Sequence, residues 1–211
     1  TVLGLSVSRK ISPTCAYLVQ GLGVSSNRVA GMLCRSPQIL GLSLNNTIIP
    51  RVDFLHREVG IPLDKLGGIL STAPALLTYS EAKTRANLAY LSATANLTGA
   101  GLTKAITKCP SILLTSLPLH LDPLIEFLRD EVGVRPERLA SLLTAQPNLI
   151  TASLPNKIKP TILWLSGTLN LSPQQVAKVV SAQPAILCFS LEENLIPKVS
   201  YLQQRLGVSL P

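Results

Sequence analysis

The stretch Asp122-Pro123-Leu124-Ile125-Glu126-Phe127-Leu128-Arg129-Asp130-Glu131-Val132-Gly133 decides the fold of this chain of 211 residues. Proline near its start, apolar residues at helical spacing and glycine at its end predict a helix of about twelve residues. Its aromatic residue, always followed by leucine, recurs at intervals of 36 or 37 residues in the following column: Tyr17, Phe54, Tyr90, Phe127, Trp164 and Tyr201. A fixed period of this length predicts an array of about six copies of one unit.

The end of each predicted helix carries a stop signal. Its terminal column contains only the two residue types that most readily adopt the left-handed cap conformation. The column reads Gly23, Gly60, Asn96, Gly133, Asn170 and Gly207. We therefore expect the first helix of every repeat to end at this column.

Two series of prolines divide each repeat. They are Pro13, Pro50, Pro123, Pro160 and Pro197, and then Pro37, Pro74, Pro110, Pro147 and Pro184. Because a proline inside a helix costs about 3 kcal/mol, we expect these prolines at helix starts or between helices.

Between the first helix and the second proline, apolar residues at positions i, i+3 and i+4 predict a second, amphipathic helix. Its apolar triplets are Val29, Met32 and Leu33; Leu66, Ile69 and Leu70; Leu139, Leu142 and Leu143; and Val176, Val179 and Val180. A short apolar pair after the second proline predicts a third helix of one or two turns. Such units bury their apolar faces only by stacking, so the sequence predicts an all-α superhelical solenoid of about six three-helix repeats of ~37 residues.

Three motifs carry a resemblance to a known family: Pro-x-Ile/Leu-Leu after the second helix, aromatic-Leu in the first helix, and a Leu/Val-Gly-Val/Ile-Ser/Pro turn. In every repeat the chain resembles the mitochondrial transcription termination factor (mTERF) family. The resemblance implies a left-handed solenoid with a basic face that binds double-stranded DNA or structured RNA. It also implies a mitochondrial or chloroplast location.

We expect one repeat domain over residues 1–211, with residues 1–12 ending a preceding repeat and later repeats starting near 13, 50, 86, 123, 160 and 197. Because both ends cut a repeat, we expect this chain to be part of a longer protein. The third repeat has Ala86 in place of proline, lacks one residue, and carries Gly99 and Gly101 at the start of its second helix. These departures predict a local irregularity in superhelical pitch.

The composition favours an acidic partner and argues against a membrane span. The formal net charge is +8, and no apolar run reaches the roughly 18 residues that a membrane helix needs. The four cysteines, Cys15, Cys34, Cys109 and Cys188, show no metal-binding spacing and adjoin apolar residues, so we expect buried free thiols.

The sequence predicts neither an enzyme nor a cofactor or metal site. His56 and His120 occupy different columns of the repeat, and neither has a recurring Cys, Ser or Asp partner, so we expect structural or solvated roles for both. Phosphate loops, HExxH motifs and zinc-spaced Cys/His clusters are missing from the sequence.

The basic residues form two columns when the repeats are aligned. Counted back from the second proline, positions nine, six and two lie on one face of the second helix; we call their cations the basic ribbon: Arg28, Lys65, Arg138, Lys104, Lys178, Arg35 and Lys108. A second column, three positions before the first helix, contains Lys10, Lys83 and Lys157, supported by Arg85 and Lys159. Stacked repeats would align both columns along a phosphate backbone, although a solvated face that keeps the solenoid soluble is the alternative for any single cation.

The sequence leaves three functions open. The first is a non-catalytic nucleic-acid-binding regulator of organelle gene expression, and the second is a structural rRNA-binding component of an organellar ribosome or other large particle. The third is protein recognition on an apolar, concave face. The aromatic column could stack on unpaired bases, but packing between neighbouring repeats explains it better.

Overall fold

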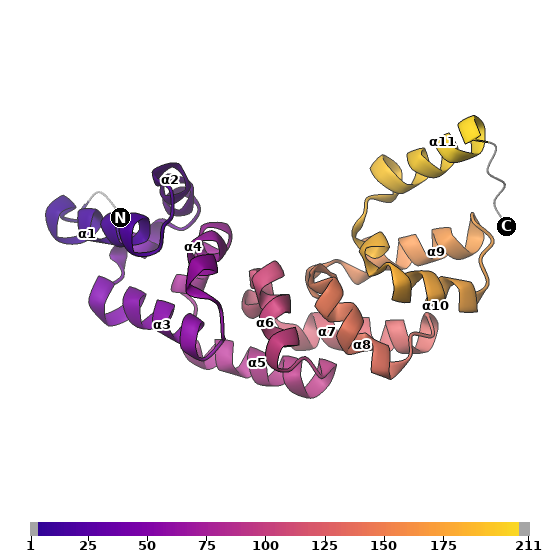
Figure 1. Cartoon of the computed structure of the whole chain (residues 1–211), viewed down its shortest axis with the longest axis horizontal. Helices are drawn as coiled ribbons and strands as arrows, with labels where there is room; N and C mark the ends of the chain where they lie inside the picture. The colour runs from indigo at the N-terminus through magenta and orange to yellow at the C-terminus, as the bar shows by residue number, and fades with distance from the viewer. Residues whose placement is uncertain (1–3, 207–211) are drawn as a thin grey trace. The chain divides into compact units, whose positions relative to one another are not determined.

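The computed structural model describes residues 4–206, which contain helical segments and turns and no strand (Figure 1). Contacts group the chain into two compact units, unit 1 with Thr1–Ser92 and Thr98–Leu114 and unit 2 with Ala93–Leu97 and Thr115–Pro211. The passage between the units falls in the third repeat, where the sequence departs from the common pattern. Each unit is described by itself below.

Unit 1 contains the first modules. Its α-helices are α1 (Ser12–Ala16), α2 (Ser26–Arg35), α3 (Ile49–Arg57), α4 (Leu63–Thr72), most of α5 (Glu81–Ala95) and α6 (Gly99–Lys108). Its 3₁₀ turns are Pro37–Gly41, Pro74–Leu77 and Pro110–Leu114, and its π turns are Val7–Ile11, Tyr17–Gly21 and Leu44–Ile48.

Unit 2 repeats the same order. Its α-helices are α7 (Leu117–Glu126), α8 (Pro136–Ala145), α9 (Lys159–Gly167), α10 (Pro173–Ala182) and α11 (Ile196–Leu206). Its 3₁₀ turns are Pro147–Thr151 and Pro184–Cys188, and its π turns are Phe127–Glu131, Leu154–Ile158 and Leu191–Leu195. The predicted third helix of each repeat is therefore present, as a single 3₁₀ turn of four or five residues that begins at the second proline.

The first proline series marks the start of the α-helical segment in several modules, with Pro13, Pro50 and Pro160 in its first turn. The helical run itself begins earlier, after a serine. Ser43, Ser153 and Ser190 accept hydrogen bonds from the backbone N–H three residues later, at 3.2, 3.3 and 3.2 Å. This side-chain bond satisfies one of the free N–H groups at a helix start. The N-cap serines form a column of their own: Ser6, Ser43, Ser80, Ser116, Ser153 and Ser190.

A π turn brings most of these helices up to the proline. The Ile48 N–H donates to the Ser43 carbonyl at 3.0 Å, five residues back, and the helix then continues through Pro50. The wider turn accommodates a ring that would otherwise clash with the carbonyl four residues earlier. Helix α5, which has Ala86 instead of proline, is α-helical throughout, whereas α7 accommodates Pro123 inside a regular α-helix.

The predicted stop of the first helix is confirmed. Gly23, Gly60, Asn96, Gly133 and Asn170 have φ values of 65, 79, 51, 79 and 53°. This is the left-handed region in which glycine and asparagine are favoured. The sixth predicted member of the column, Gly207, lies outside the described residues.

The core follows the predicted apolar stripes. Met32 of α2, Leu66 and Leu70 of α4 and Leu143 of α8 are fully buried. In unit 1, α4 approaches the turn before α2 so closely that a Cβ added at Gly67 would lie 2.2 Å from the Leu22 carbonyl oxygen. Glycine at this position therefore sets the spacing between two modules.

The four cysteines are free, but the prediction that all are buried is wrong. Cys109 is buried, Cys15 and Cys188 are half-buried, and Cys34 is exposed. Cys34 follows the apolar residue Leu33 in sequence but lies on the solvent side of α2, because adjacent residues of a helix point in different directions. Within residues 4–206 no helix is long and apolar enough to cross a membrane.

Candidate nucleic-acid interface

The basic ribbon residues are all exposed on the second helices of their modules. In unit 1 they are Arg28 and Arg35 on α2, Lys65 on α4, and Lys104 and Lys108 on α6; in unit 2 they are Arg138 on α8 and Lys178 on α10. The acids of these helices, Asp64 and Glu137, lie in the first turn, where they favour the helix dipole. The rest of each second helix is neutral or basic.

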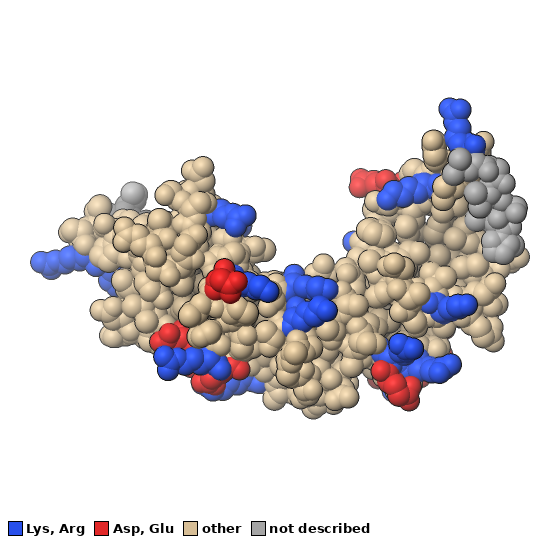
Figure 2. Space-filling view, viewed as in Figure 1, with Lys and Arg blue, Asp and Glu red and all other residues tan. Residues whose placement is uncertain are grey.

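Unit 1 sets three of these helices beside one another. Helices α2 and α4 pack together, and the turn before α4 contacts α6, since a Cβ added at Gly60 would lie 3.1 Å from Thr103 Oγ1. Figure 2 shows Lys and Arg atoms on the viewed face over this region. The Arg35 guanidinium also donates a hydrogen bond to the Ser71 carbonyl at the end of α4, which links two successive modules.

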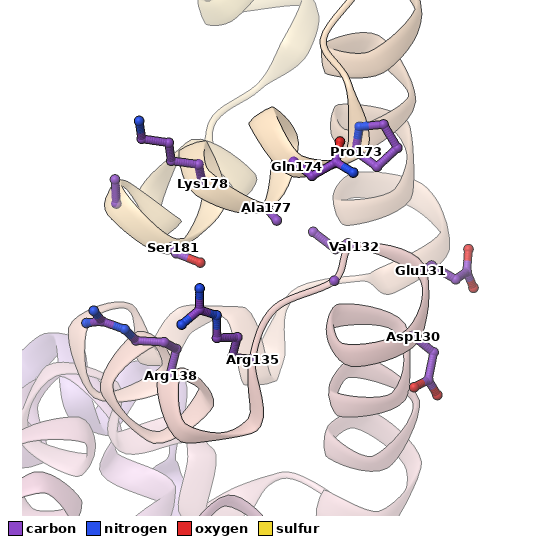
Figure 3. A pocket seen from close by; sticks show the side chains of 12 residues that line it. Asp130, Glu131, Val132, Arg135, Arg138, Pro173, Gln174, Ala177, Lys178 and Ser181 are labelled. Carbon is purple, nitrogen blue, oxygen red and sulfur yellow. The ribbon is translucent and has the colours of Figure 1, made fainter.

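Unit 2 contains a basic groove between α8 and α10, with a volume of about 790 Å³ (Figure 3). Arg135 and Arg138 form one wall at the start of α8, and Lys178 lies on the other wall, on α10. Four of the groove-lining residues of α10 follow a helical stripe with spacing i, i+3, i+4 and i+7: Gln174, Ala177, Lys178 and Ser181. Pro173 and Ala182 line the groove at the two ends of the helix. Gly133, in its left-handed conformation, turns the chain from the first helix into this wall.

Two acids also border the groove, but other cations hold them. Arg129 donates hydrogen bonds of 2.7 and 2.8 Å to the two carboxylate oxygens of Asp130, which hold the pKa of that carboxyl below its usual value. Glu131 pairs with Lys159 at 3.2 Å. In Figure 3 both carboxylates point away from Arg135 and Arg138. The three cations of the groove are therefore not neutralised by these acids, and the groove is suited to an anion.

The cations of the second basic column are surrounded differently from those of the groove. Arg85 and Lys159 lie where the first helices of two successive modules meet. Arg85 pairs with Glu58 and with Glu81 and lies 4.7 Å from the Phe54 ring centre. The ion pair to Glu58 raises the pKa of Arg85. Lys159 lies 5.0 Å from the Phe127 ring centre in addition to its pair with Glu131.

The three remaining lysines of this column differ among themselves. Lys10 donates to the Leu42 carbonyl at 3.4 Å, and Lys83 lies 5.7 Å from the Tyr79 ring centre. Lys157 is half-buried in the π turn Leu154–Ile158. These local contacts leave the second column less open to a ligand than Arg138 and Lys178, the two basic-ribbon residues of the groove.

The histidines follow the structural or solvated interpretation, whereas the aromatic column follows the packing interpretation only in part. His56 Nδ1 lies 2.8 Å from the Ile61 carbonyl oxygen, and His120 is exposed. Phe54 and Phe127 are buried, whereas Tyr201 of α11 is 60% exposed. The described residues contain no cluster of three metal-ligating side chains.

Sequence reasoning missed two groove residues, Arg135 and Gln174. Arg135 occupies the N-cap position of α8, where other modules carry a different residue type, so a search for periodic cations passes over it. Gln174 is uncharged and lies in the first turn of α10. Both residues are recognised only in the folded unit, where they line the same groove.

The repeated helical modules of both units agree with the comparison to known families. The mTERF family model matches residues 1–130 and 125–210, which together span nearly the whole chain. The chain belongs to the mTERF family. Its helical-repeat fold is the fold of that family, whose members bind nucleic acid in organelle gene expression and are generally non-catalytic. A comparison with individual curated proteins gave no match.

Proposed function

We propose that this mTERF chain is a non-catalytic protein of organelle gene expression that docks its second helices on double-stranded DNA or structured RNA. The observation that carries the proposal is the basic groove between α8 and α10, where Arg135, Arg138 and Lys178 meet without a neutralising carboxylate. The cations of α2, α4 and α6 offer a second set of phosphate contacts in unit 1. Phosphate contacts position a protein on nucleic acid and release counterions, so binding should weaken steeply with salt.

Unit 2 allows a charge-matched experiment. The double variant Arg138→Gln with Lys178→Gln removes two cations from the groove, and Lys198→Gln with Arg205→Gln removes two from α11, which does not line the groove. Affinity for duplex DNA and for folded RNA is measured against salt for both. We expect the groove variant to lose affinity and about two units of the salt slope, while the control keeps both. The proposal is rejected if the two variants lose affinity and salt dependence equally, or if the affinity of the unchanged protein does not depend on salt.

A second candidate is a structural rRNA-binding component of a mitochondrial or chloroplast ribosome or another large particle. The chain has a mean hydropathy of +0.36, and unit 2 exposes Leu119 and Leu163 at 75 and 70%. Leu163 also borders a smaller apolar cavity of about 330 Å³ with Phe127 and Val176. In a large particle, a neighbouring component would cover these exposed apolar side chains.

Sedimentation of an organelle extract separates the candidates. A regulator stays in the light fractions, and a particle component sediments with the ribosomal subunits until the rRNA is digested. Release from the particle by a polar substitution at Leu163, with retained binding to free nucleic acid, would point to protein recognition on this face.

A further inference from the structure

We propose that Gln174 is a specificity-determining residue of the groove between α8 and α10 and that it reads an adenine base. The inference rests on the proposed function, because it names what the groove recognises in addition to phosphate. The cations of the groove supply affinity without sequence information. A neutral side chain with directional hydrogen-bonding groups must supply the discrimination.

The geometry places Gln174 in the stripe of α10 that faces the groove. It shares this stripe with Lys178, one helical turn later, and with Ser181. Arg135 and Arg138 lie on the facing wall (Figure 3). A nucleotide whose phosphates contact these cations would therefore present its base within reach of the Gln174 amide.

The neighbouring glutamine shows that Gln174 is not needed for the helix start. Gln175 accepts a hydrogen bond from the Ser172 N–H at 2.7 Å, and its own N–H donates to Ser172 Oγ at 3.3 Å. These two bonds form the capping box of α10. Gln174 is exposed, and within residues 4–206 its side-chain amide makes no hydrogen bond. Its amide is therefore available to a ligand.

The chemistry of the amide selects the base. A glutamine side chain offers one carbonyl acceptor and an NH₂ donor, and adenine offers the complementary N6 donor and N7 acceptor. Guanine has two acceptors along the same edge and so pairs with arginine or lysine instead. In RNA the adenine must lie in a loop or bulge, because the major groove of an A-form helix is too narrow to read.

The equivalent position varies between modules, and its two acids, Asp64 and Glu137, also favour the dipole of their own helices. Ten residues before the second proline the chain has Asn27, Asp64, Ala100, Glu137 and Gln174, and four of these five side chains can hydrogen-bond a base edge. The adjacent column, nine residues before that proline, instead keeps its charge in three modules, as Arg28, Lys65 and Arg138. A phosphate contact requires a positive charge, whereas a base contact requires a residue suited to the base that it reads.

Selection from random libraries tests the inference, with one arm of duplex DNA and one arm of structured RNA. The full chain should enrich a sequence with a fixed adenine. Gln174→Ala should lose the preference at that one position, which corresponds to roughly ten- to hundredfold less discrimination. Its affinity for unselected nucleic acid should fall far less than that of the double variant at Arg138 and Lys178. Gln174→Glu, which can only accept, should shift the preference to cytosine, whose N4 group donates.

Gln175→Ala is the matched control, because it changes the same residue type one position along. We expect it to lower thermal stability and to leave the selected base unchanged. If Gln174→Ala selects the same base as the unchanged protein, or if the unchanged protein selects no sequence, the inference is wrong. Loss of binding in the Arg138 and Lys178 variants would then still support the proposed function, whereas unchanged binding in them would reject the function itself.

Discussion

The ammonium of Lys159 lies 3.2 Å from a carboxylate oxygen of Glu131, which belongs to the preceding module. It also lies over the ring of Phe127, one helical turn before Glu131. Arg85, Glu58 and Phe54 repeat the arrangement in unit 1. We call these two sets of three residues the module latches, because each joins the first helices of two successive modules.

The latch and the groove should respond differently to the loss of one lysine. Lys178→Ala is expected to weaken nucleic-acid binding and to reduce the salt slope by about one unit. Lys159→Ala combined with Glu131→Ala, which leaves no unpaired carboxylate at the groove, should leave binding nearly unchanged and lower the free energy of unfolding by about 0.2–1 kcal/mol, the range for exposed ion pairs. Binding titrations and denaturant unfolding of both variants check this, and an equal loss of affinity would show that the latch side also contacts the ligand.

Two adjacent glycines of α4 give a test of module spacing. Gly67→Ala should destabilise the chain by roughly 1–3 kcal/mol, because the added methyl group would meet the Leu22 carbonyl at 2.2 Å. Gly68 has no atom within 4 Å of its added Cβ, so Gly68→Ala should stabilise by about 0.5–1 kcal/mol. Denaturant midpoints measure both changes. The packing described for α4 is incorrect if the two variants shift the midpoint in the same direction.

The N-cap serines also have an internal control. Ser153→Ala should lower the free energy of unfolding by about 1 kcal/mol, because Ser153 Oγ accepts a hydrogen bond from the Asn156 N–H. Ser116 occupies the same position in its module but makes no side-chain cap bond, so Ser116→Ala should have a smaller effect. Thermal unfolding of the two variants compares them, and a larger loss at Ser116 would contradict the cap assignment.

Stability should fall at alkaline pH through Tyr17. Burial, and then the Asp53 carboxylate, raise the pKa of this half-buried phenol above its ordinary value of about 10. The folded state therefore holds the proton more tightly, and the contribution to stability is complete below the unfolded pKa and is lost as the pH rises through the folded one. Tyr17→Phe removes this dependence, so its unfolding midpoint should fall less steeply above pH ~10. If the unfolding midpoints of Tyr17→Phe and of the unchanged protein fall in parallel with pH, Tyr17 does not contribute to the loss of stability.

Much of the fold could be predicted because the period of the repeat makes each local signal visible several times. The left-handed positions, from Gly23 to Asn170, follow from residue type alone. The early helix starts were missed, although the serines from Ser6 to Ser190 repeat as regularly as the aromatic residues. A proline inside a helix usually argues for a break, and only the structure shows how a π turn before Pro50 or Pro160 avoids one.

The candidate site could be predicted less well, because it depends on side chains from different columns. Arg138 and Lys178 occupy different columns of the repeat, yet α8 and α10 bring them to one groove. The pairs Arg85 with Glu58 and Lys159 with Glu131 join residues 27 and 28 positions apart, and the sequence alone does not show that they meet. A charge column read from sequence therefore overstates the number of cations available to a ligand.

Every first helix opens near a serine and closes at a left-handed glycine or asparagine wherever the structure describes both ends. Each module thus contains the residues that start and end its first helix. Among the described residues, no backbone hydrogen bond from the next module completes this helix. A module exchanged at these two points would keep its helix ends intact. Duplication and exchange of whole modules could in this way reassort groove residues such as Gln174 without rebuilding the scaffold.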